Sequence, residues 1–575
     1  MQLQNSVFRI QHSKFLKKQQ NPKNQKKGPP TIKNKRPKIL LSGVFGPYGV
    51  DDEFGRAENI MELFHNQVTK AQGNASLRFH HRSFGLYFLA ANVNAETTIL
   101  DFPSRRRFIR ELRKTDYDYV GISFITPNFL KAREMATLVR EYSPSSTIIL
   151  GGHGAAIEGV ENLIDCDEVV RGEGVCQLRR ILGEDPARPV THPVLPANEY
   201  SRVFGIPMGG SRAGLLVPGV GCVNGCQFCS TSHFFGKEYT PYISTGREMF
   251  ELAQKSSEAM NTRDFFVMDE NFLKNPERAL ELIEHMDHHD EWFNFYLFSS
   301  ADTIRDFGIA NMLKLGSIFT WVGFESPNND TYEKTRNIDP KELVTNLRDH
   351  GVSVLASAIL GTEEHTPETI GDDIDYFVDL NADMVQFMLL TALPVTGLYK
   401  NMQDSRQLRE ELPFEDWHGQ KVLNWRHDSL NDTAAENWLN RAFRSDYEVN
   451  SSSIYRMAET AFRGWERLKA SGEEMLENAF KPRLEIAAER VRNVVRILPT
   501  VIRNAVNSVE KERAEKLLAR IRENFGSASI LERLEQVGAR FFSSRWARRV
   551  QRCGDRVQPV PIITRHRPED PPVFL

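Results

Sequence analysis

The chain has 575 residues, which is more than one ordinary domain contains. Hydrophobic residues make up 40% and charged residues 26% of the sequence, so buried cores can form, and collagen-like, coiled-coil and wholly disordered classes are excluded. No apolar run reaches the roughly 18 residues of a membrane span, and the N-terminus lacks the apolar core of a signal peptide. Six cysteines are too few for a disulfide framework, so we predict a cytoplasmic protein.

Charge is distributed unevenly along the chain. Residues 1–38 carry eleven Lys and Arg and no acidic residue, residues 481–552 carry 17 basic and 8 acidic residues, and residues 39–480 carry 42 basic and 65 acidic residues. The acidic body predicts no binding of nucleic acid, whereas both basic segments suit an anionic surface. We therefore expect a peripheral membrane contact and a lipid or terpenoid-like substrate, with a peptide or a small soluble metabolite as alternatives.

The N-terminal part predicts a tail followed by an open sheet. Residues 1–37 are rich in Lys, Gln, Asn and Pro, which indicates a disordered basic tail. Residues 38–184 alternate short apolar runs with helical stretches, which is typical of an α/β protein with a doubly wound, Rossmann-like parallel sheet. The strands are expected at 38–43, 97–100, 119–123, 147–150 and 168–170.

Ligands of such sheets bind beyond the carboxyl ends of the strands. Glycines at these ends either let a large flat ligand approach the backbone or simply form tight turns. The candidate ligand-binding residues at the strand ends are Thr126, Asn128, Gly151, Gly152, His153, Gly172 and Glu173.

A second alternating series follows a Pro-punctuated linker at 185–212. Six strand–helix units within 213–400 predict a partial (β/α)6 barrel, with its chemistry at the C-terminal ends of the strands. The strands are expected at 214–220, 264–268, 293–299, 318–324, 352–360 and 384–390. Residues 401–552 form a mainly helical C-terminal region with breaks at Pro482 and Pro499, and residues 553–575 form a tail.

Arginine-rich helical sequence occupies much of the basic C-terminal segment. Residues 486–506 and 528–550 mix Arg with Ile, Val, Leu, Phe and Trp546, a pattern that suits an interfacial helix on anionic lipid. It equally suits an arginine-bearing helix that packs on the barrel, and this second interpretation is the one we favour.

The most informative motif is a group of cysteines after the first barrel strand. Cys222, Cys226 and Cys229 have the spacing C-x3-C-x2-C, and three thiolates on one loop can hold three irons of a cubane cluster. The fourth iron then stays open for an exchangeable ligand, as a catalytic metal site requires. A zinc site or three unligated thiols are the alternatives. The other cysteines are expected to lie apart: Cys166, Cys176 and Cys553.

This loop and its setting resemble the radical S-adenosylmethionine (SAM) superfamily, in which reductive cleavage of SAM yields a 5′-deoxyadenosyl radical. The resemblance implies a [4Fe-4S] cluster on the three cysteines, SAM as a cofactor, and a one-electron reductant such as flavodoxin or ferredoxin. Segments at the later strand ends resemble the SAM-binding segments of the family. The SAM-binding residues so implied are Phe228, Asp269, Glu270, Glu325, Ser326 and Gly361. Each carboxylate has helix capping or ion pairing as its alternative role.

The domain order resembles the subgroup that carries a cobalamin-binding domain ahead of the radical SAM domain. The resemblance covers about residues 38–400, and its most distinctive segment is Arg171-Gly172-Glu173-Gly174. It implies cobalamin, bound by the seven strand-end residues named above. The axial-histidine motif D-x-H-x-x-G is absent, as it commonly is in the subgroup. We therefore expect His153 to touch the nucleotide tail or cap a helix rather than bind cobalt. A domain that kept the fold and lost the cofactor is the alternative.

The resemblance implies an enzyme that methylates an unactivated carbon, with methylcobalamin as the methyl donor. The alternatives are a cobalamin-dependent radical cyclase or oxidative enzyme, and a non-catalytic iron–sulfur sensor. The sequence does not identify the substrate. Candidates for the substrate end of the barrel, or else for its packing, are Trp417, His418, Trp425 and His427.

Overall fold

A computed structural model describes most of the chain. The described residues are 36–46, 67–68, 70–72, 77–203, 206–208, 213–327, 333–471, 480–505, 507–528, 533–534, 536–538, 541–545, 548 and 562–575. The expected N-terminal tail and Cys553 lie outside them. By contacts, residues 37–575 form one unit.

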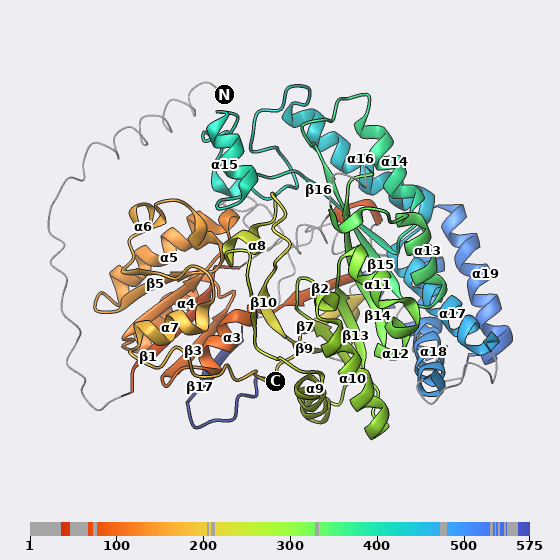
Figure 1. Ribbon diagram of the computed structural model, residues 1–575, viewed down its shortest axis with the longest axis horizontal. Coiled ribbons are helices and arrows are strands. Elements are labelled where there is room, and N and C mark those ends of the chain that lie inside the picture. The colour runs from red at the N-terminus through yellow and green to blue at the C-terminus, as the bar shows by residue number, and fades with distance from the viewer. Residues whose placement is uncertain are drawn as a thin grey trace. The chain divides into compact units, whose positions relative to one another are not determined.

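The first sheet has the predicted parallel strands and one antiparallel edge strand (Figure 1). The parallel strands are β1 (Lys38–Gly43), β3 (Glu96–Asp101), β4 (Tyr119–Ser123), β5 (Thr147–Gly151) and β6 (Glu168–Val169). Their order, with β17 at the edge, is β17-β3-β1-β4-β5-β6. Because β4, β5 and β6 are neighbouring parallel strands, their carboxyl ends lie along one edge of the sheet.

Helices cover both faces of this sheet because the strand residues are apolar on both sides. Leu40 packs with helices α4 (Arg105–Lys114) and α5 (Phe129–Tyr142). Ile39 and Leu41 face the other side and pack with α3 (Phe84–Ala91) and α7 (Gly174–Ile181). This alternation confirms the predicted doubly wound sheet.

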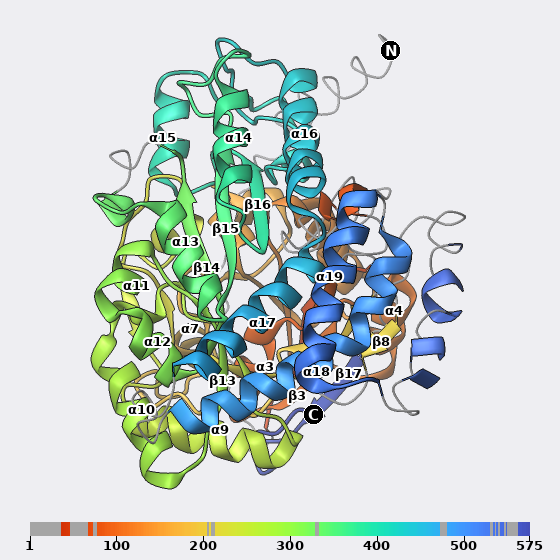
Figure 2. The same ribbon diagram turned by 90° about the vertical axis from the view of Figure 1, so that its right-hand side faces the viewer.

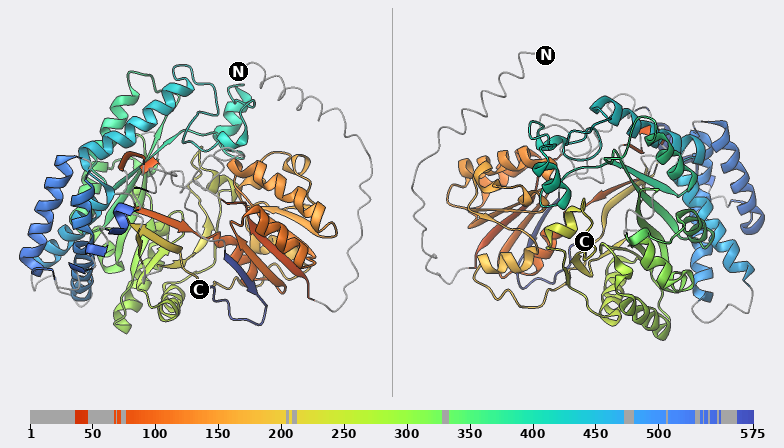
Figure 3. Two further views of the ribbon diagram at one scale, coloured as in Figure 1. Left: turned by 180° about the vertical axis from the view of Figure 1, so that it is seen from behind. Right: turned by 45° about the horizontal axis from the view of Figure 1, so that its top comes forward.

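The C-terminal residues differ from the expected tail. Strand β17 (Ile562–His566) pairs antiparallel with β3, so the end of the chain completes the first sheet (Figure 3). Phe574 is buried in the same core, and Val573 bridges Val194. A strand of five residues is too short to be recognised from its pattern alone. Its partner strand lies more than 450 residues earlier in the chain, so no neighbouring segment indicates the pairing.

The segment expected to be a linker also contains strands. Strands β7 (Asn198–Val203) and β8 (Ile206–Met208) form an antiparallel sheet with β2 (Leu77–His81). The prolines that suggested a linker precede this sheet, except for Pro207, which lies in the edge strand β8.

The second sheet contains six parallel strands in the order β16-β15-β14-β13-β12-β9. The strands are β9 (Gly214–Leu216), β12 (Asp264–Val267), β13 (Asn294–Phe298), β14 (Ser317–Glu325), β15 (Ser353–Leu360) and β16 (Met384–Leu389). This arrangement confirms the partial barrel. The first predicted strand is split after β9, because Pro218 separates β9 from β10 (Gly219–Gly221), which pairs with β11 (Tyr239–Pro241).

Helices connect the barrel strands and cover their outer side. These helices are α9 (Gly246–Met260), α10 (Pro276–His289), α11 (Ala301–Phe307), α12 (Ile309–Leu315), α13 (Pro340–Asp349) and α14 (Ile370–Asp379). Local sequence explains their starts: Thr245 and Glu248 form a capping box at α9, and the Asp339 carboxylate caps α13 ahead of Pro340.

The C-terminal region is mainly helical, as predicted. Its helices are α15 (Gly397–Asp404), α16 (Asp432–Asn450), α17 (Ser453–Ala470), α18 (Phe480–Asn504) and α19 (Ser508–Phe525). Figure 2 shows α17, α18 and α19 side by side. The predicted breaks are wrong, because α18 runs through both prolines. Pro482 lies in its first turn, where no backbone hydrogen bond is lost, and Pro499 is accommodated inside the helix.

Helix α18 packs on the barrel rather than standing apart from it. The buried guanidinium of Arg483 donates to the carbonyl oxygen of Phe293, and Arg490 donates to that of Gly351. This confirms the favoured interpretation of the arginine-rich segment over residues 486–504. Within the described part of the chain, no helix is long and apolar enough to cross a membrane.

Candidate active site

The cysteine loop begins where β10 ends. Gly221 there has a φ of 92°, a conformation that favours glycine. Ser232 in helix α8 (Ser230–Phe234) holds the loop from behind. Its hydroxyl donates to the carbonyl oxygen of Cys222 at 2.7 Å and accepts the N–H of Gly225 at 3.1 Å. This role of Ser232 was not predicted, because its contacts form only when α8 packs against the cysteine loop.

The three loop thiols influence one another. Burial raises the pKa of each thiol, to about 12 for Cys229, and charges on Cys222 and Cys226 contribute to that rise. Buried thiolates need nearby positive charge, which iron supplies, so the donor set fits an iron–sulfur cluster. Across the described residues, no three His, Cys, Asp or Glu side chains are arranged to hold one ion. Convergence of the three thiolates on a cluster therefore stays a prediction.

The five described cysteines form no disulfide. Cys166 lies just before β6 and packs at the edge of the first core. Cys176 lies in α7 and donates to the carbonyl oxygen of Pro186. Both are therefore part of the first domain rather than of the cysteine loop.

The structure separates the two carboxylates that follow β12. Asp269 is buried and ion-paired with Arg278 at 2.9 Å, and it also accepts the hydroxyl of Tyr239 at 2.8 Å and the N–H of Asn271. These contacts give Asp269 the ion-pairing role that was its alternative. Pairing of this kind orients β11 and α10 against β12.

Glu270 has a different partner, because its side chain forms a hydrogen bond with Thr231, two residues after Cys229. Glu270 is exposed at its surface, but the protein packed around the carboxyl group and the negative charge of Asp269 raise the pKa of Glu270 to about 7. Its charge in turn contributes to the raised pKa of Cys222 and of Cys229. A carboxylate beside the cysteine loop is suited to accept a hydrogen bond from an ammonium group.

A buried ion pair lies where β14 ends. Lys334 donates to Glu325 at 2.6 Å, and both side chains are largely buried. Burial disfavours the charge of Lys334, but Glu325 and Cys226 outweigh this and raise the pKa of Lys334. Lys334 was not predicted as a site residue, because it belongs to no motif of the sequence. Ser326 follows Glu325 directly, and its N–H donates to the carbonyl oxygen of Phe324.

The remaining predicted SAM-binding positions lie in the barrel. Gly361 follows β15 with a φ of 69°, and Phe228 packs at the edge of the barrel core. Contact of both residues with SAM stays a prediction.

The aromatic residues predicted at the substrate end of the barrel contact the chain just after strands β15 and β16. The Trp425 indole donates to the carbonyl oxygen of Leu390 at 3.1 Å, and His427 contacts the carbonyl oxygen of Thr362. Trp417 is buried, and its indole N–H has no partner among the described residues. Trp425 and His427 thus fit the packing alternative, while Trp417 keeps a donor available. His418 is buried beside it.

On the first sheet, the loops after β4 and β5 carry polar and small residues. Thr126 and Asn128 are buried in a short 3-10 turn, and the amide oxygen of Asn128 has no hydrogen-bond partner among the described residues. Gly151 has no heavy atom within 4 Å of the place where a Cβ would stand, whereas a Cβ on Gly152 would lie 2.6 Å from the Phe124 carbonyl oxygen. Cobalamin carries amide groups around its ring. The amide oxygen of Asn128, which lacks a partner, could accept a hydrogen bond from one of them, and the space beside Gly151 lets the ring approach the backbone.

His153 joins the two domains. Its ring stacks on Phe234 of α8 with centroids 4.6 Å apart, so the loop after β5 meets the helix that follows the cysteines (Figure 1). Burial lowers the pKa of His153 to about 4, which keeps the imidazole neutral. Arg171 supports this loop by donating to the carbonyl oxygen of Ala155 at 2.8 Å.

Glu173 makes a second link. It caps α7 by accepting the N–H groups of Val175 and Cys176, and it accepts the hydroxyl of Tyr242 at 2.6 Å. Both carboxylate oxygens are therefore used within the protein. Gly172 before it has a φ of 82°, which glycine permits. Tyr242 follows β11 and was not predicted as a site residue.

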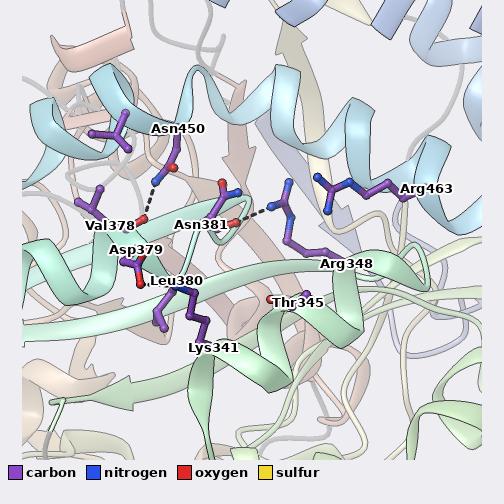
Figure 4. A pocket seen from close by; sticks show the side chains of 10 residues that line it. Lys341, Thr345, Arg348, Val378, Asp379, Leu380, Asn381, Asn450 and Arg463 are labelled. Atoms are coloured by element: carbon purple, nitrogen blue, oxygen red, sulfur yellow. Dashed lines mark hydrogen bonds and ion pairs between the residues drawn. The ribbon is translucent and has the colours of Figure 1, made fainter. Parts of the chain in front are cut away.

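A cavity of about 300 Å³ lies at the opposite, N-terminal ends of the barrel strands (Figure 4). It is lined by Lys341, Thr345, Arg348, Val378, Asp379, Leu380, Asn381, Val449, Asn450 and Arg463. Its arginines are already paired, Arg348 with Asp383 and Arg463 with Asp349. In barrels of this kind the N-terminal face serves stability, and we assign this cavity no part in the site.

Comparison with known proteins agrees with the two-domain arrangement. Residues 73–182 match the B12 binding domain family and residues 216–377 match the Radical SAM superfamily. An uncharacterized methyltransferase of Pyrococcus horikoshii is 25% identical over 366 residues, covering 55% of this chain and 77% of the relative. An anaerobic magnesium-protoporphyrin IX monomethyl ester cyclase of Rubrivivax gelatinosus is 23% identical over 354 residues, covering 54% of this chain and 62% of the cyclase.

Among solved structures, the chain resembles the radical SAM methyltransferase TsrM of Kitasatospora setae, whose structure contains cobalamin and a [4Fe-4S] cluster. The TM-score is 0.52 at 14% identity, and the match covers 80% of this chain and all of that one. This likeness concerns the fold.

The chain therefore combines a B12-binding domain at residues 73–182 with a radical SAM domain that follows it at residues 216–377. It is a B12-dependent radical SAM enzyme, and its cofactors are those of the two families: cobalamin, SAM and a [4Fe-4S] cluster. Enzymes of this superfamily need an electron donor and a substrate.

Proposed function

We propose that the enzyme methylates an unactivated carbon of its substrate. The observation that carries the proposal is the contact between His153 and Phe234, which brings the strand-end loops of the B12-binding domain to the helix behind the cysteine loop. The methyltransferase relative supports the same reaction. When bound, the cluster and SAM supply a carbon radical, and cobalamin carries the methyl group.

The roles of the SAM-side residues follow from their positions. Cys222, Cys226 and Cys229 hold the cluster, and Ser232 fixes their loop. Glu270 accepts from the ammonium group of SAM, because Asp269 is engaged by Arg278. Phe228, Gly361 and the segment at Glu325 and Ser326 border the rest of SAM. This last group of roles rests on family resemblance.

The roles on the cobalamin side follow in the same way. The open backbone at Gly151 and the unpaired amide oxygen of Asn128 receive the corrin and one of its amides. His153 stays neutral and stacked on Phe234, so it borders the corrin rather than binding cobalt. Thr126, Gly152 and Gly172 shape the same edge of the sheet. Glu173 contributes by holding α7 and Tyr242.

For partners, we propose flavodoxin or ferredoxin as the one-electron donor. A lipid or terpenoid-like substrate remains the proposal from the charge distribution. Much of its basis, residues 1–35 and much of 529–561, lies outside the described residues. The buried Trp417 indole offers one donor to a polar group of such a substrate.

Methylation is tested without knowing the substrate. The full chain, reconstituted anaerobically with iron, sulfide and hydroxocobalamin, is reduced with titanium(III) citrate and given SAM. Transfer of the SAM methyl group to cobalt releases S-adenosylhomocysteine, which we expect in amounts equal to the bound cobalamin. 5′-Deoxyadenosine in the same reaction reports radical formation.

The control variant separates the two chemistries. Cys226→Ala should lose the iron–sulfur cluster and 5′-deoxyadenosine, whereas Cys166→Ala should keep both. Full iron content in Cys226→Ala would contradict the cluster assignment. 5′-Deoxyadenosine without S-adenosylhomocysteine in the wild type would instead favour the second candidate, a cyclase or oxidative enzyme, which the cyclase relative supports.

A further inference from the structure

The chain exposes an apolar surface in the helical segment that follows α19. Within residues 533–548 the structure describes 533–534, 536–538, 541–545 and 548, and all of these residues are helical. The four large apolar side chains among them keep more than half of their surface accessible: 63% for Leu534, 60% for Val537, 60% for Phe541 and 53% for Phe542. No other phenylalanine whose side chain the structure describes is exposed.

The buried residues of the same segment are polar. Gln536 is 7% exposed and Ser543 is fully buried, and residues seven apart lie on one face of a helix. Leu534, Val537 and Phe541 follow one another at intervals of three and four residues, which places them together on another face. The usual amphipathic order is therefore reversed, with polar side chains turned inward and apolar side chains turned outward. A contiguous apolar surface of this kind marks an interaction site.

Arginines accompany the apolar side chains. Arg533, Arg545 and Arg548 are exposed. Arg545 and Arg548 follow Leu534 by eleven and fourteen residues, which is close to three and four helical turns, so they lie on or beside its face. Over residues 533–549 the sequence has five arginines and one acidic residue. The surface thus combines apolar side chains with a strong positive charge.

An anionic bilayer matches this combination. Phenylalanine and leucine side chains enter the boundary between lipid headgroups and acyl chains, while arginine side chains reach from there to the phosphates. A second copy of this chain fits less well, because a symmetric interface would bring the arginines of the two copies together. The acidic body of the protein, residues 39–480 with 42 basic and 65 acidic residues, would be repelled by the same bilayer, so contact would be confined to basic segments.

We propose that residues 533–548 form a docking surface for an anionic phospholipid bilayer. Leu534, Val537, Phe541 and Phe542 enter the interfacial layer, and the arginines contact lipid phosphates. Residues 486–504 differ, because their helix α18 packs on the barrel through its arginines. The inference goes beyond the proposed function and does not depend on methyl transfer. It would bring the enzyme to the place where a lipid or terpenoid-like substrate is found.

The test is flotation of the reconstituted full chain with vesicles of phosphatidylcholine alone or of phosphatidylcholine mixed with phosphatidylglycerol. We expect binding to the mixed vesicles that weakens as salt is raised, and little binding to phosphatidylcholine alone. The double variant Phe541→Ser/Phe542→Ser should lower the partition coefficient by at least about tenfold, because two rings no longer enter the interface. Both rings are exposed, so the fold should not depend on them.

The charge is tested separately from the apolar side chains. Arg545→Gln/Arg548→Gln should weaken binding to the mixed vesicles by about tenfold or more. Its binding should also depend less on salt than that of the wild type, since two cations fewer meet the lipid phosphates.

Matched controls lie on other helices. Leu280→Ser/Val509→Ser removes two exposed apolar side chains from α10 and α19, and Arg247→Gln/Arg305→Gln removes two exposed arginines from α9 and α11. Both double variants should bind the mixed vesicles as the wild type does. Circular dichroism and iron content of each variant establish that fold and cluster are retained.

Four results would overturn the proposal. The first is wild-type protein that stays unbound with both kinds of vesicle, and the second is equal binding to both kinds. The third is undiminished binding of the Phe541→Ser/Phe542→Ser variant, which would place the contact elsewhere in the chain. The fourth is a wild-type dimer that this variant converts to a monomer, as seen by light scattering, which would assign the surface to a second copy. Products of SAM measured without vesicles test the proposed function independently.

Discussion

At the residue scale, neighbouring side chains of the candidate site have different roles: some hold the fold together and others are available to a cofactor. Asp269 and Glu270 are neighbours in the sequence, yet Asp269 forms an ion pair with Arg278, while the charge of Glu270 acts on Cys222 and Cys229. The sequence predicts that a carboxylate here meets SAM, but not which one. The choice depends on Arg278, which comes from the next helix and carries no motif. The same holds for Ser232 and Lys334, which act through contacts that only the fold creates.

The raised pKa of Glu270 leads to a prediction on SAM binding. A carboxylate accepts from an ammonium more strongly than a neutral carboxyl group does, so SAM binding should strengthen as the pH rises through about 7. Glu270→Gln should weaken SAM binding by about tenfold to a hundredfold, which corresponds to the loss of one charge-assisted hydrogen bond. Equilibrium dialysis of SAM with the reconstituted protein measures both effects.

The control for this prediction is the Glu284→Gln variant. Glu284 is an exposed residue of α10, so its substitution should leave SAM affinity and its pH dependence unchanged. Affinity of Glu270→Gln that still rises through pH 7 would show that another group titrates and that Glu270 does not receive the ammonium.

At the scale of elements, strands that are long apolar runs were predicted correctly. Short strands without such a run were not. All five predicted strands of the first sheet and the six of the barrel are present, because each is a buried run between helical stretches. Strand β17 was missed, as were β7 and β8, because their partners are far away in the sequence. A helix break was wrongly predicted at Pro499, because packing of α18 tolerates a proline inside the helix.

Packing of the C-terminal segment on the first sheet is tested at Phe574. Its ring is buried and lies 5.3 Å from the ring of Tyr87, and its carbonyl oxygen accepts from Arg82 at 2.6 Å. Phe574→Ala should lower the free energy of unfolding by about 3–5 kcal/mol. Thermal unfolding followed by circular dichroism should show a lower midpoint.

The neighbouring Leu575 provides the control, since it is exposed. Leu575→Ala should change the stability by no more than about 0.5 kcal/mol. Equal midpoints for Phe574→Ala and Leu575→Ala would show that the C-terminal segment does not stabilise the first sheet.

At the scale of the whole molecule, the account depends on two cofactor sites that meet. The B12-binding domain presents its strand ends to the radical SAM domain through His153 on Phe234 and Glu173 on Tyr242. The order of the two domains and their families is predictable from sequence. Their contacts are not, because Phe234 and Tyr242 belong to no motif and are brought to the first domain by α8 and β11.

The most direct measurement is the cofactor content of the full chain after anaerobic reconstitution with iron, sulfide and hydroxocobalamin, followed by gel filtration. We predict one cobalamin and four iron atoms per chain, with the cobalamin retained in Cys226→Ala, whose cluster is lost. A wild-type protein that holds the four iron atoms but passes through gel filtration without cobalamin would contradict the account.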